Sequence, residues 1–385
     1  GMNVGVYISP HLFETRERIR IGDACVTAQA LDDALVRVQG AADTVSGDST
    51  ADPSLLLPTP FEALTAAAFL LFAEAKVDVV VLEVGLGGRL DATNIVDPWV
   101  SIVTRIGHDH QAILGQSLAA IAEQKVAIGR TGRPLIVAQA AVTLGAARRI
   151  GLEADVRKVG VDLRIVDAAV SGKTLRTTGV LEGKAVGEPL HVELALAGLH
   201  QLENAAAAVL GYVALDEQLR QRGLPALPPP VEVVWALGSV DWPARAEILA
   251  ERPLVVLDGA HNPDGVAALV ELLSARGNRW QTVLSMRSNR DPEEVIRALA
   301  PITETFFLPR LVGPTLRPAR ALADEIERIA PQAAVAVGPP AACLQAAVSE
   351  ASPLGSVVVT GSLHGVGEWL GSGLLESARL TRWLG

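Results

Sequence analysis

The sequence has few cysteines and no long apolar run, and both shortages restrict what the protein can be. Cys25 and Cys343 are its only cysteines and stand far apart, which excludes a disulfide framework or a cysteine-cluster metal site and suits a reducing cytosol. The longest largely apolar run, residues 63–73, is shorter than the roughly 20 residues that cross a bilayer. No signal peptide opens the chain. We therefore expect a cytoplasmic protein without a membrane partner.

Positive charge is also scarce. The chain holds 33 Lys and Arg against 43 Asp and Glu, a net charge of −10. This balance argues against a non-specific nucleic-acid binder, although a local basic pocket for an anionic ligand stays open. We expect small molecules rather than nucleic acid as partners, and a monomer.

Apolar residues, in contrast, are plentiful. They make up 49% of the 385 residues, a length that exceeds the size at which one hydrophobic core usually stops growing. Two domains are therefore expected. Prolines cluster without clear periodicity in residues 222–245, which is typical of an interdomain connection. We place the domains at residues 1–246 and 247–385.

The first domain has the rhythm of alternating strands and helices. Strands are expected at residues 4–9, 77–84, 99–104 and 134–139, and helices at 59–75 and 117–128. The continuous apolar residues of 77–84 predict a parallel strand covered on both faces. Thr59 is the expected N-cap of its helix, with Pro60 at the first position and Glu62 closing a capping box. Residues 155–197 predict a small antiparallel patch, which a helix over about 201–220 closes.

The second domain repeats the alternation more cleanly. Apolar runs such as "PLVVLDGA", "WQTVLSM" and "SVVVTGS" alternate with helical stretches such as "PDGVAALVELLSA" and "RPARALADEIERI". The fold class is therefore α/β: a mostly parallel first sheet with an antiparallel patch, followed by a doubly wound, Rossmann-like α/β domain.

Unusual polar residues follow three of the expected strands. Ser9, Glu83 and His110 stand at or after strand ends, where ligands of parallel sheets bind. Together they are able to hold a hard divalent cation, and the glycines after Glu83 allow a close backbone approach. Taken singly, Glu83 is equally a loop cap and His110 is more often structural.

Seven ordered motifs carry a resemblance that covers residues 1 to about 275, and more loosely the rest. They are "YISPHL…ERIRI", "TPFEALT", "LEVGLGGRLDATN", "TRIGHDH…LG…IAEQKVAI", "LAGLHQLENAAAA", "WPARAEIL" and "LDGAHNPDG". In this order they resemble the folylpolyglutamate synthase and dihydrofolate synthase family of Mur-type ligases. The resemblance implies ATP-dependent amide-bond formation, in which a carboxylate becomes an acyl phosphate and the amino group of L-glutamate attacks it.

The resemblance also implies roles for single residues. Ser9, Glu83 and His110 would bind Mg²⁺, and Lys125 would bind a second Mg²⁺ once carbamylated, with Lys125, His110 and Arg245 as the catalytic set. Asn204, Arg245, Asp258 and His261 would contact ATP. The pocket for dihydropteroate or folate would be lined by Thr59, Pro60, Phe61, Glu62, Leu90, Asp91 and Ala92. Asn204 and His200 are also possible helix caps, and Asp258 a loop residue.

The sequence departs from the family's pattern in its phosphate loop. Family members carry a P-loop before the "SPHL" motif, whereas only eight residues precede Ser9 here. We reject Gly172-Lys173-Thr174 as a substitute, because Asp167 stands where the first glycine belongs and antiparallel strands are expected around it. An open edge or gap in the first sheet is expected to follow. Ala244 replaces the family's usual glycine before Arg245, and "SMRSNRD" replaces a DKD-like triplet.

Three explanations suit this departure: a truncated gene model, an engineered fragment and a degenerate paralogue. Retention of the metal residues, Lys125 and Arg245 favours truncation. The leading hypothesis is the folate ligase, inactive as residues 1–385 alone. The alternatives are a non-catalytic nucleotide- or folate-binding paralogue and, less favoured by the motifs, a Mur ligase of cell-wall synthesis.

Overall fold

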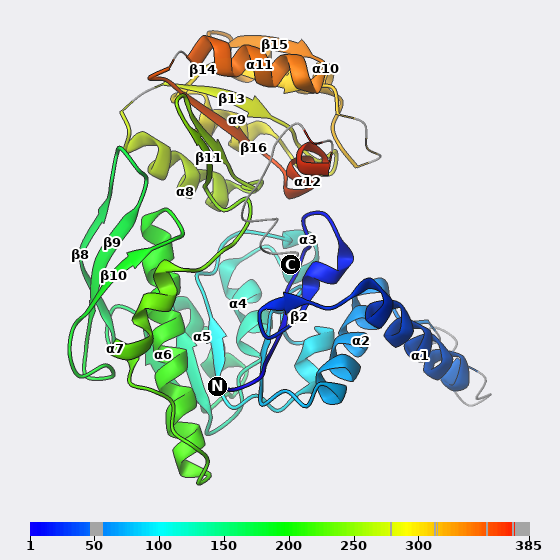
Figure 1. Ribbon diagram of the computed structural model, residues 1–385, viewed down its shortest axis with the longest axis vertical. Helices are drawn as coiled ribbons and strands as arrows, with labels where there is room; N and C mark the ends of the chain where they lie inside the picture. The colour runs from blue at the N-terminus through cyan, green and yellow to red at the C-terminus, as the bar shows by residue number, and fades with distance from the viewer. Residues whose placement is uncertain are drawn as a thin grey trace.

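The computed structural model describes residues 1–46, 57–277, 279–311, 313, 315–351, 353–371 and 373. Figure 1 shows the yellow-to-red C-terminal part stacked on the blue-to-green N-terminal part. The strands are β1 (Val4–Tyr7), β2 (Ile19–Ile21), β3 (Ala24–Cys25), β4 (Val79–Leu82), β5 (Ser101–Val103), β6 (Pro134–Val137), β7 (Asp155–Lys158), β8 (Arg164–Val170), β9 (Thr177–Glu182), β10 (Leu190–Leu194), β11 (Glu247–Glu251), β12 (Leu254–Leu257), β13 (Trp280–Leu284), β14 (Thr303–Pro309), β15 (Ala334–Gly338) and β16 (Ser356–Thr360).

The helices confirm most of the expected segments. Thr59 caps its helix and shares a reciprocal capping box with Glu62, as predicted. The α-helices are α1 (Ala28–Ser46), α2 (Pro60–Glu74), α3 (Gln111–Leu114), α4 (Leu118–Val126), α5 (Ala140–Arg149), α6 (Leu199–Gln221), α7 (Pro230–Val233), α8 (Pro263–Ser274), α9 (Glu293–Leu299), α10 (Ala319–Ile329), α11 (Pro340–Ala351) and α12 (Leu363–Gly371).

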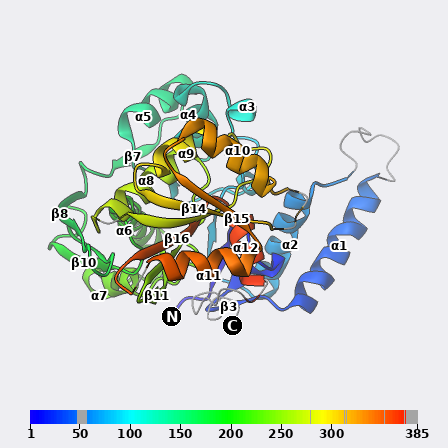
Figure 2. The same cartoon turned by 90° about the horizontal axis from the view of Figure 1, so that it is seen from above.

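Helix α1 is an addition to the predicted elements. Its buried residues Leu31, Ala34 and Val38 share a core with α2, to which Leu71 and Phe72 contribute. Figure 2 shows α1 lying beside α2 at the periphery, away from the other helices. The apolar spacing of 31, 34 and 38 is helical, so the sequence carried a signal for it.

The first domain contains two separate part-sheets in its described residues. One has the order β3-β2-β1-β4 and the other the order β5-β6-β7. In the second part-sheet β6 is covered on both faces: Leu135 and Val137 pack against α4 and α5, while Ile136 packs against α6. That arrangement is the one expected for a parallel strand.

Strand β4 departs from the prediction of a strand covered on both faces. It pairs with β1 in parallel, Tyr7 opposite Leu82, but Val80 is 38% and Val81 54% exposed. Ile102 of β5 is 38% exposed as well. An apolar run reports what a strand prefers, and the neighbouring segments decide whether it is covered. The open edge expected in the first sheet is therefore present among the described residues.

The antiparallel patch lies where it was predicted. Strands β8, β9 and β10 form an antiparallel sheet in the order β10-β9-β8, packed on α6. Gly172-Lys173-Thr174 lies in the turn between β8 and β9, where the Ser171 hydroxyl accepts hydrogen bonds from the N–H groups of Lys173 and Thr174. No strand-to-helix phosphate loop exists at this position.

The second domain is a doubly wound sheet of order β11-β12-β16-β13-β14-β15. Helices α8, α9 and α10 cover one face, around Val256, Trp280 and Phe306. Helices α11 and α12 cover the other, around Leu257 and Trp369. The Rossmann-like prediction is confirmed. Strand β11 begins at Glu247 and belongs to this sheet; the boundary at 246 itself stays a prediction, and residues 374–385 lie outside the described part.

Candidate functional site

Glu83 and Ser9 meet at the adjacent ends of β4 and β1. The Ser9 N–H donates a hydrogen bond to Oε2 of Glu83, with 2.7 Å between N and O. The Glu83 N–H in turn donates to the Tyr7 carbonyl at 2.8 Å. Parallel pairing brings these residues side by side, as predicted from their places at strand ends.

The environment of Glu83 is electrostatically unusual. Partial desolvation by the surrounding protein raises the pKa of the Glu83 carboxyl above its ordinary value, although the residue keeps contact with solvent. The Ser9 hydrogen bond and the charges of Arg245 and Arg18 oppose that rise in pKa. Arg245 comes from the connection between the domains, so charges from outside the first sheet also act on Glu83.

Asp91 organises the glycine loop that follows Glu83. Its buried carboxylate accepts hydrogen bonds from the N–H groups of Gly85 (3.0 Å), Leu86 (2.9 Å) and Thr93 (2.9 Å), and from the Thr93 hydroxyl (2.6 Å). Such a carboxylate satisfies backbone donors that a loop would otherwise leave unpaired. The flexible, polar sequence therefore forms a fixed loop.

The glycine loop rests on the end of the helix that carries Lys125. The Arg89 N–H donates to the Gln124 carbonyl at 2.9 Å. A Cβ on Gly88 would lie 2.6 Å from that carbonyl and 3.2 Å from the carbonyl of Lys125, and Gly88 has φ +152°. Only glycine permits this approach. The loop after β4 and Lys125 on α4 are thus held as one unit.

Lys125 is a half-buried cation. Burial lowers its pKa below the ordinary lysine value, and the negative charge of Asp109 opposes this. Lysine on a helix surface is usually fully solvated, so this half-buried environment is atypical of a surface lysine. A larger neutral fraction of the amine follows from the lowered pKa.

His110 stands in a strained conformation at the start of α3. Its φ of 52° and ψ of 33° place it in the left-handed region, which is unusual for a residue with a side chain. The ring is exposed and lies 3.8 Å from Oδ1 of Asp109. Among the described residues no hydrogen bond or ion pair joins His110 to Ser9 or Glu83, so the convergence of all three stays a prediction.

Arg245 is presented by a strained strap. Its neighbours Ala244 (φ 55°) and Ala246 (φ 44°) are both left-handed and buried. Two buried carboxylates fix them: Oε2 of Glu247 accepts the Ala244 N–H at 3.0 Å, and Oδ2 of Asp258 accepts the Ala246 N–H at 2.8 Å. The Arg245 side chain itself remains exposed. Locally stored strain of this kind concentrates at functional sites.

Of the other predicted nucleotide contacts, Asp258 lies directly against this strap. Asp258 also accepts the Ala260 N–H through Oδ1 at 2.7 Å, so both its oxygens position backbone. Burial lowers the pKa of His261, whose Nδ1 lies 2.8 Å from the Gly259 carbonyl. Asn204 is exposed on α6 and donates to the Gln201 side chain. The N-cap of α6 is Gly198, so Asn204 and His200 are not caps.

The residues predicted to line the substrate pocket split into structural and available groups. Thr59 and Glu62 are engaged in capping, and Pro60 opens α2. The Phe61 ring packs 5.8 Å from that of Tyr7. Leu90 is 91% exposed, and Ala92 begins a short 3-10 helix, Ala92–Ile95. Their binding roles, and that of Asp91, stay predictions.

The donor set suits a hard cation that substrate phosphates help to hold. The part of the chain that the structure describes contains no group of three or more His, Cys, Asp or Glu able to hold a metal. Glu83 and the Ser9 hydroxyl are hard oxygen ligands, and Mg²⁺ is commonly bound by one or two carboxylates plus phosphates. The fit therefore rests on oxygen chemistry rather than on a preformed cage.

Two residues at this site were missed from the sequence. Asp109 accepts hydrogen bonds from Asn262 and Arg290 of the second domain. The Glu247 carboxylate accepts a hydrogen bond from the Ala244 N–H. Their signals were adjacency to His110 and to Arg245, but a carboxylate beside a candidate ligand reads as solvated until its partners are seen.

The comparisons with known proteins agree with this geometry. Residues 31–211 match the Mur ligase middle domain, and residues 244–363 match the Mur ligase, glutamate ligase domain. The dihydrofolate synthase/folylpolyglutamate synthase of Escherichia coli (strain K12) is 31% identical over 378 residues, which are 95% of this chain and 79% of that protein. The chain belongs to the folylpolyglutamate synthase and dihydrofolate synthase family. The resemblance inferred from the motifs is confirmed.

Further likenesses define the extent of the match. The structure of E. coli FolC in complex with DHPP and ADP is 28% identical, with a TM-score of 0.78, over 96% of this chain and 82% of that chain. A probable bifunctional folylpolyglutamate synthase/dihydropteroate synthase of Halobacterium salinarum is 33% identical over 96% of this chain. The chain spans only 43% of that relative's length. In the described residues, every helix is too short or too polar to cross a membrane.

Proposed function

We propose that the protein ligates L-glutamate to dihydropteroate, to a reduced folate, or to both, using ATP and an acyl-phosphate intermediate. The observation that carries this proposal is the convergence on Glu83. The Glu83 carboxylate follows β4 and accepts a hydrogen bond from the Ser9 N–H. The charge of Arg245, which lies in the strained connection between the two domains, acts on the same carboxylate. Phosphoryl transfer needs positioning and neutralisation of charge more than covalent chemistry.

Each side chain has a role in that reaction. Glu83 and Ser9 would hold Mg²⁺, which neutralises phosphate charge when bound. Arg245 would contact the phosphates as the domains meet, since its planar group suits phosphate oxygens. Asn204, Asp258 and His261 border the nucleotide in this proposal, with Asp258 acting through the strap that it holds.

Lys125 would act as a carbamate that binds a second Mg²⁺. The neutral amine is the form that reacts with CO₂, and burial lowers the pKa of Lys125 and so enlarges the neutral fraction. The carbamate would supply an anionic oxygen ligand, which an unmodified ammonium cannot. This support comes from the environment of Lys125 alone, because its half-buried position on α4 favours carbamate formation whether or not a metal ion is bound.

We further propose that residues 1–385 by themselves do not sustain ligation. Gly172-Lys173-Thr174 lies in a hairpin turn, and the sequence holds no other Gly-Lys-Ser/Thr. A P-loop surrounds the β- and γ-phosphates with N–H groups and a lysine. Without it, ATP is attracted by Arg245 but not held in line with the substrate carboxylate. The alternative function is nucleotide or folate binding without ligation.

The test compares residues 1–385 with a version carrying an added N-terminal strand, P-loop and helix of the family. Phosphate release that depends on both glutamate and dihydropteroate or tetrahydrofolate is measured for each. We expect the extended version to be faster by at least about 10²-fold, since losing one charge-stabilising group commonly costs that much. Equal rates would place the phosphate site elsewhere and reopen Gly172-Lys173-Thr174. No ligation by either version would favour the binding protein.

A further inference from the structure

One irregular segment of the first domain lies directly against the second domain. Residues 104–110 connect β5 to α3, and they carry both His110 and Asp109. The start of α8 and the segment after β13 contribute the opposing side chains, Asn262 and Arg290. The interface therefore touches the residue that precedes a candidate metal ligand.

Asp109 is the centre of this contact. Its Oδ1 accepts a hydrogen bond from Arg290 Nη1 at 2.8 Å, and its Oδ2 accepts one from Asn262 Nδ2 at 3.0 Å. The same Oδ1 accepts the His110 N–H at 2.8 Å. One carboxylate thus joins two elements of the second domain to the left-handed turn at His110. Charge-assisted hydrogen bonds of this kind are the stronger ones in proteins.

Gly107 allows the two domains to come this close. A Cβ on Gly107 would lie 1.8 Å from Oδ2 of Asp264, in the first turn of α8. Any side chain at 107 would displace either Asp264 or the start of α8. The approach of the α8 start to residues 107–109 is consequently steric as well as polar.

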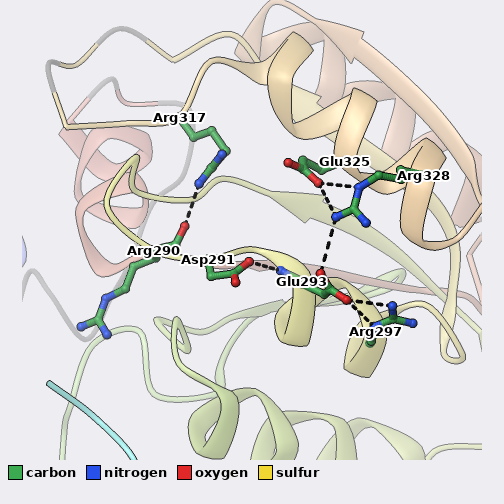
Figure 3. A network of polar contacts seen from close by, with 7 residues as sticks. All are labelled: Arg290, Asp291, Glu293, Arg297, Arg317, Glu325 and Arg328. Atoms are coloured by element: carbon green, nitrogen blue, oxygen red, sulfur yellow. Dashed lines mark hydrogen bonds and ion pairs between the residues drawn. The ribbon is translucent and has the colours of Figure 1, made fainter. Parts of the chain in front are cut away.

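Arg290 is itself held in place from behind. Arg317 Nη2 donates to the Arg290 carbonyl at 2.7 Å and to the Ser288 carbonyl at 3.4 Å. Figure 3 shows the Arg290 side chain pointing away from Arg317 and from the Glu293 cluster, whose arginines Arg297 and Arg328 stay within the second domain. Arg290 therefore faces the first domain from a loop that Arg317 braces.

We propose that Asp109 is a positioning residue that makes the His110 turn respond to the second domain. Its carboxylate fixes the turn through the His110 N–H only while Arg290 and Asn262 hold the carboxylate in place. Closure of the domains and the placement of His110 are then a single event. The catalytic meaning of this coupling rests on the proposed ligase function; the coupling itself does not.

The experiment measures the distance between the domains in residues 1–385. Fluorophores are attached at Glu188→Cys and Glu327→Cys, and in a second pair at Gln39→Cys and Glu327→Cys, all exposed positions. Both native cysteines are buried. The variants are Asp109→Asn, Arg290→Met, Arg290→Lys and Gly107→Ala. Arg328→Met is the matched control, because it removes the same charge from an ion pair within the second domain.

We expect Arg290→Met and Asp109→Asn to raise the ratio of open to closed molecules about tenfold, the effect of losing one charge-assisted hydrogen bond. Arg290→Lys should restore most of the closed population, and Arg328→Met should resemble the parent. Gly107→Ala should open the molecule with the Asp109–Arg290 charges intact. Circular dichroism confirms folding of each variant.

Unchanged distances in both Arg290→Met and Asp109→Asn would overturn the proposal. An equal shift in Arg328→Met would also overturn it, since the effect would then follow from charge alone. Absence of ligase activity in the extended version would remove the proposed function but leave these distances unaffected, so the two failures are distinguishable.

Discussion

Strands β4 and β12 have nearly the same sequence and opposite surroundings. β4 reads Val-Val-Val-Leu and β12 reads Leu-Val-Val-Leu, and both pair in parallel with a neighbour. All four residues of β12 are buried, whereas Val81 of β4 is 54% exposed. The difference is the number of partners: β12 lies between β11 and β16, while β4 pairs only with β1 among the described strands.

This contrast separates two tasks within one chain. The six-stranded sheet, with helices on both faces, provides a stable body. The first domain contains the half-buried Lys125, the Glu83 carboxyl with its raised pKa, and His110 in a left-handed backbone conformation. Its first sheet is open along one edge among the described strands. Half-buried charges and strained backbone of this kind cost local stability.

The largest expected effect comes from placing an aspartate in β12, compared with the same substitution in β4. Val256→Asp should destabilise the protein by more than about 4 kcal/mol, because it buries a charge without a partner. Val256 is 0% exposed. Val81→Asp should cost roughly 1 kcal/mol, mainly through strand propensity. Urea unfolding followed by tryptophan fluorescence, to which the buried Trp280 and Trp369 of the second domain contribute, measures the first effect, and far-UV circular dichroism measures both.

Equal costs for the two substitutions would contradict the description of β4 as half-exposed. The same result would show that an additional strand or a second molecule covers β4 in solution. A concentration series of Val81→Asp separates these cases, since only a second molecule makes the cost depend on protein concentration.

Local signals in the sequence predicted the fold where the physics is local. The capping box of Thr59 and Glu62 and the hairpin around Gly172 depend on residues a few positions apart, and both were read correctly. The exposure of β4 depends on which strand lies beside it, and the Val-Val-Val-Leu run carries no information about that. Continuous apolar sequence thus predicted strand direction but overstated burial.

The second prediction sharpens the comparison by separating activity from stability. In the extended version, Lys125→Met should lower the ligation rate about 10²- to 10³-fold, because in the proposed function Lys125 is a ligand that acts on transferred charge. ATP affinity should change much less, and Lys184→Met, an exposed lysine, serves as the control. Phosphate release and equilibrium ATP binding are the two measurements. Equal losses in both would leave Lys125 structural.

The same substitution should not weaken the fold. Burial lowers the pKa of Lys125, so at pH values between the folded pKa and the ordinary value the unfolded chain binds more protons, and stability rises with pH. Below the folded pKa the full penalty of the buried charge applies. Lys125→Met should therefore raise stability at neutral pH by up to about 1 kcal/mol and flatten the rise at alkaline pH. Urea titrations across this alkaline range test the sign.

The candidate site was predictable only for residues that carry their own motif. Ser9 and Glu83 stand at the ends of their strands, and their contact followed from parallel pairing. Asp109 was missed because its partners Asn262 and Arg290 lie 153 and 181 residues away in sequence. The strain at Ala244 was equally invisible, because backbone angles within a connection are set by Glu247 and Asp258 rather than by the local residues.

The smallest expected effect concerns that strain. Ala244 and Ala214 are both 0% exposed, but Ala244 has φ 55° whereas Ala214 lies in the interior of α6. Alanine pays roughly 1–2 kcal/mol for the left-handed conformation, and glycine does not. Ala244→Gly relieves this cost while losing a buried methyl worth about 0.8 kcal/mol and freeing the unfolded chain by about 0.4–1 kcal/mol. The gains and losses nearly cancel, so stability should change by less than about 0.5 kcal/mol. Ala214→Gly loses the same methyl and helix propensity without any relief, and should cost roughly 2 kcal/mol. Paired urea titrations give the difference between the two variants.

If Ala244→Gly proved as costly as Ala214→Gly, the strap would not hold its left-handed conformation in solution, and the presentation of Arg245 would need another explanation. A near-zero change would show why alanine is tolerated in this left-handed conformation: the buried methyl offsets most of the strain.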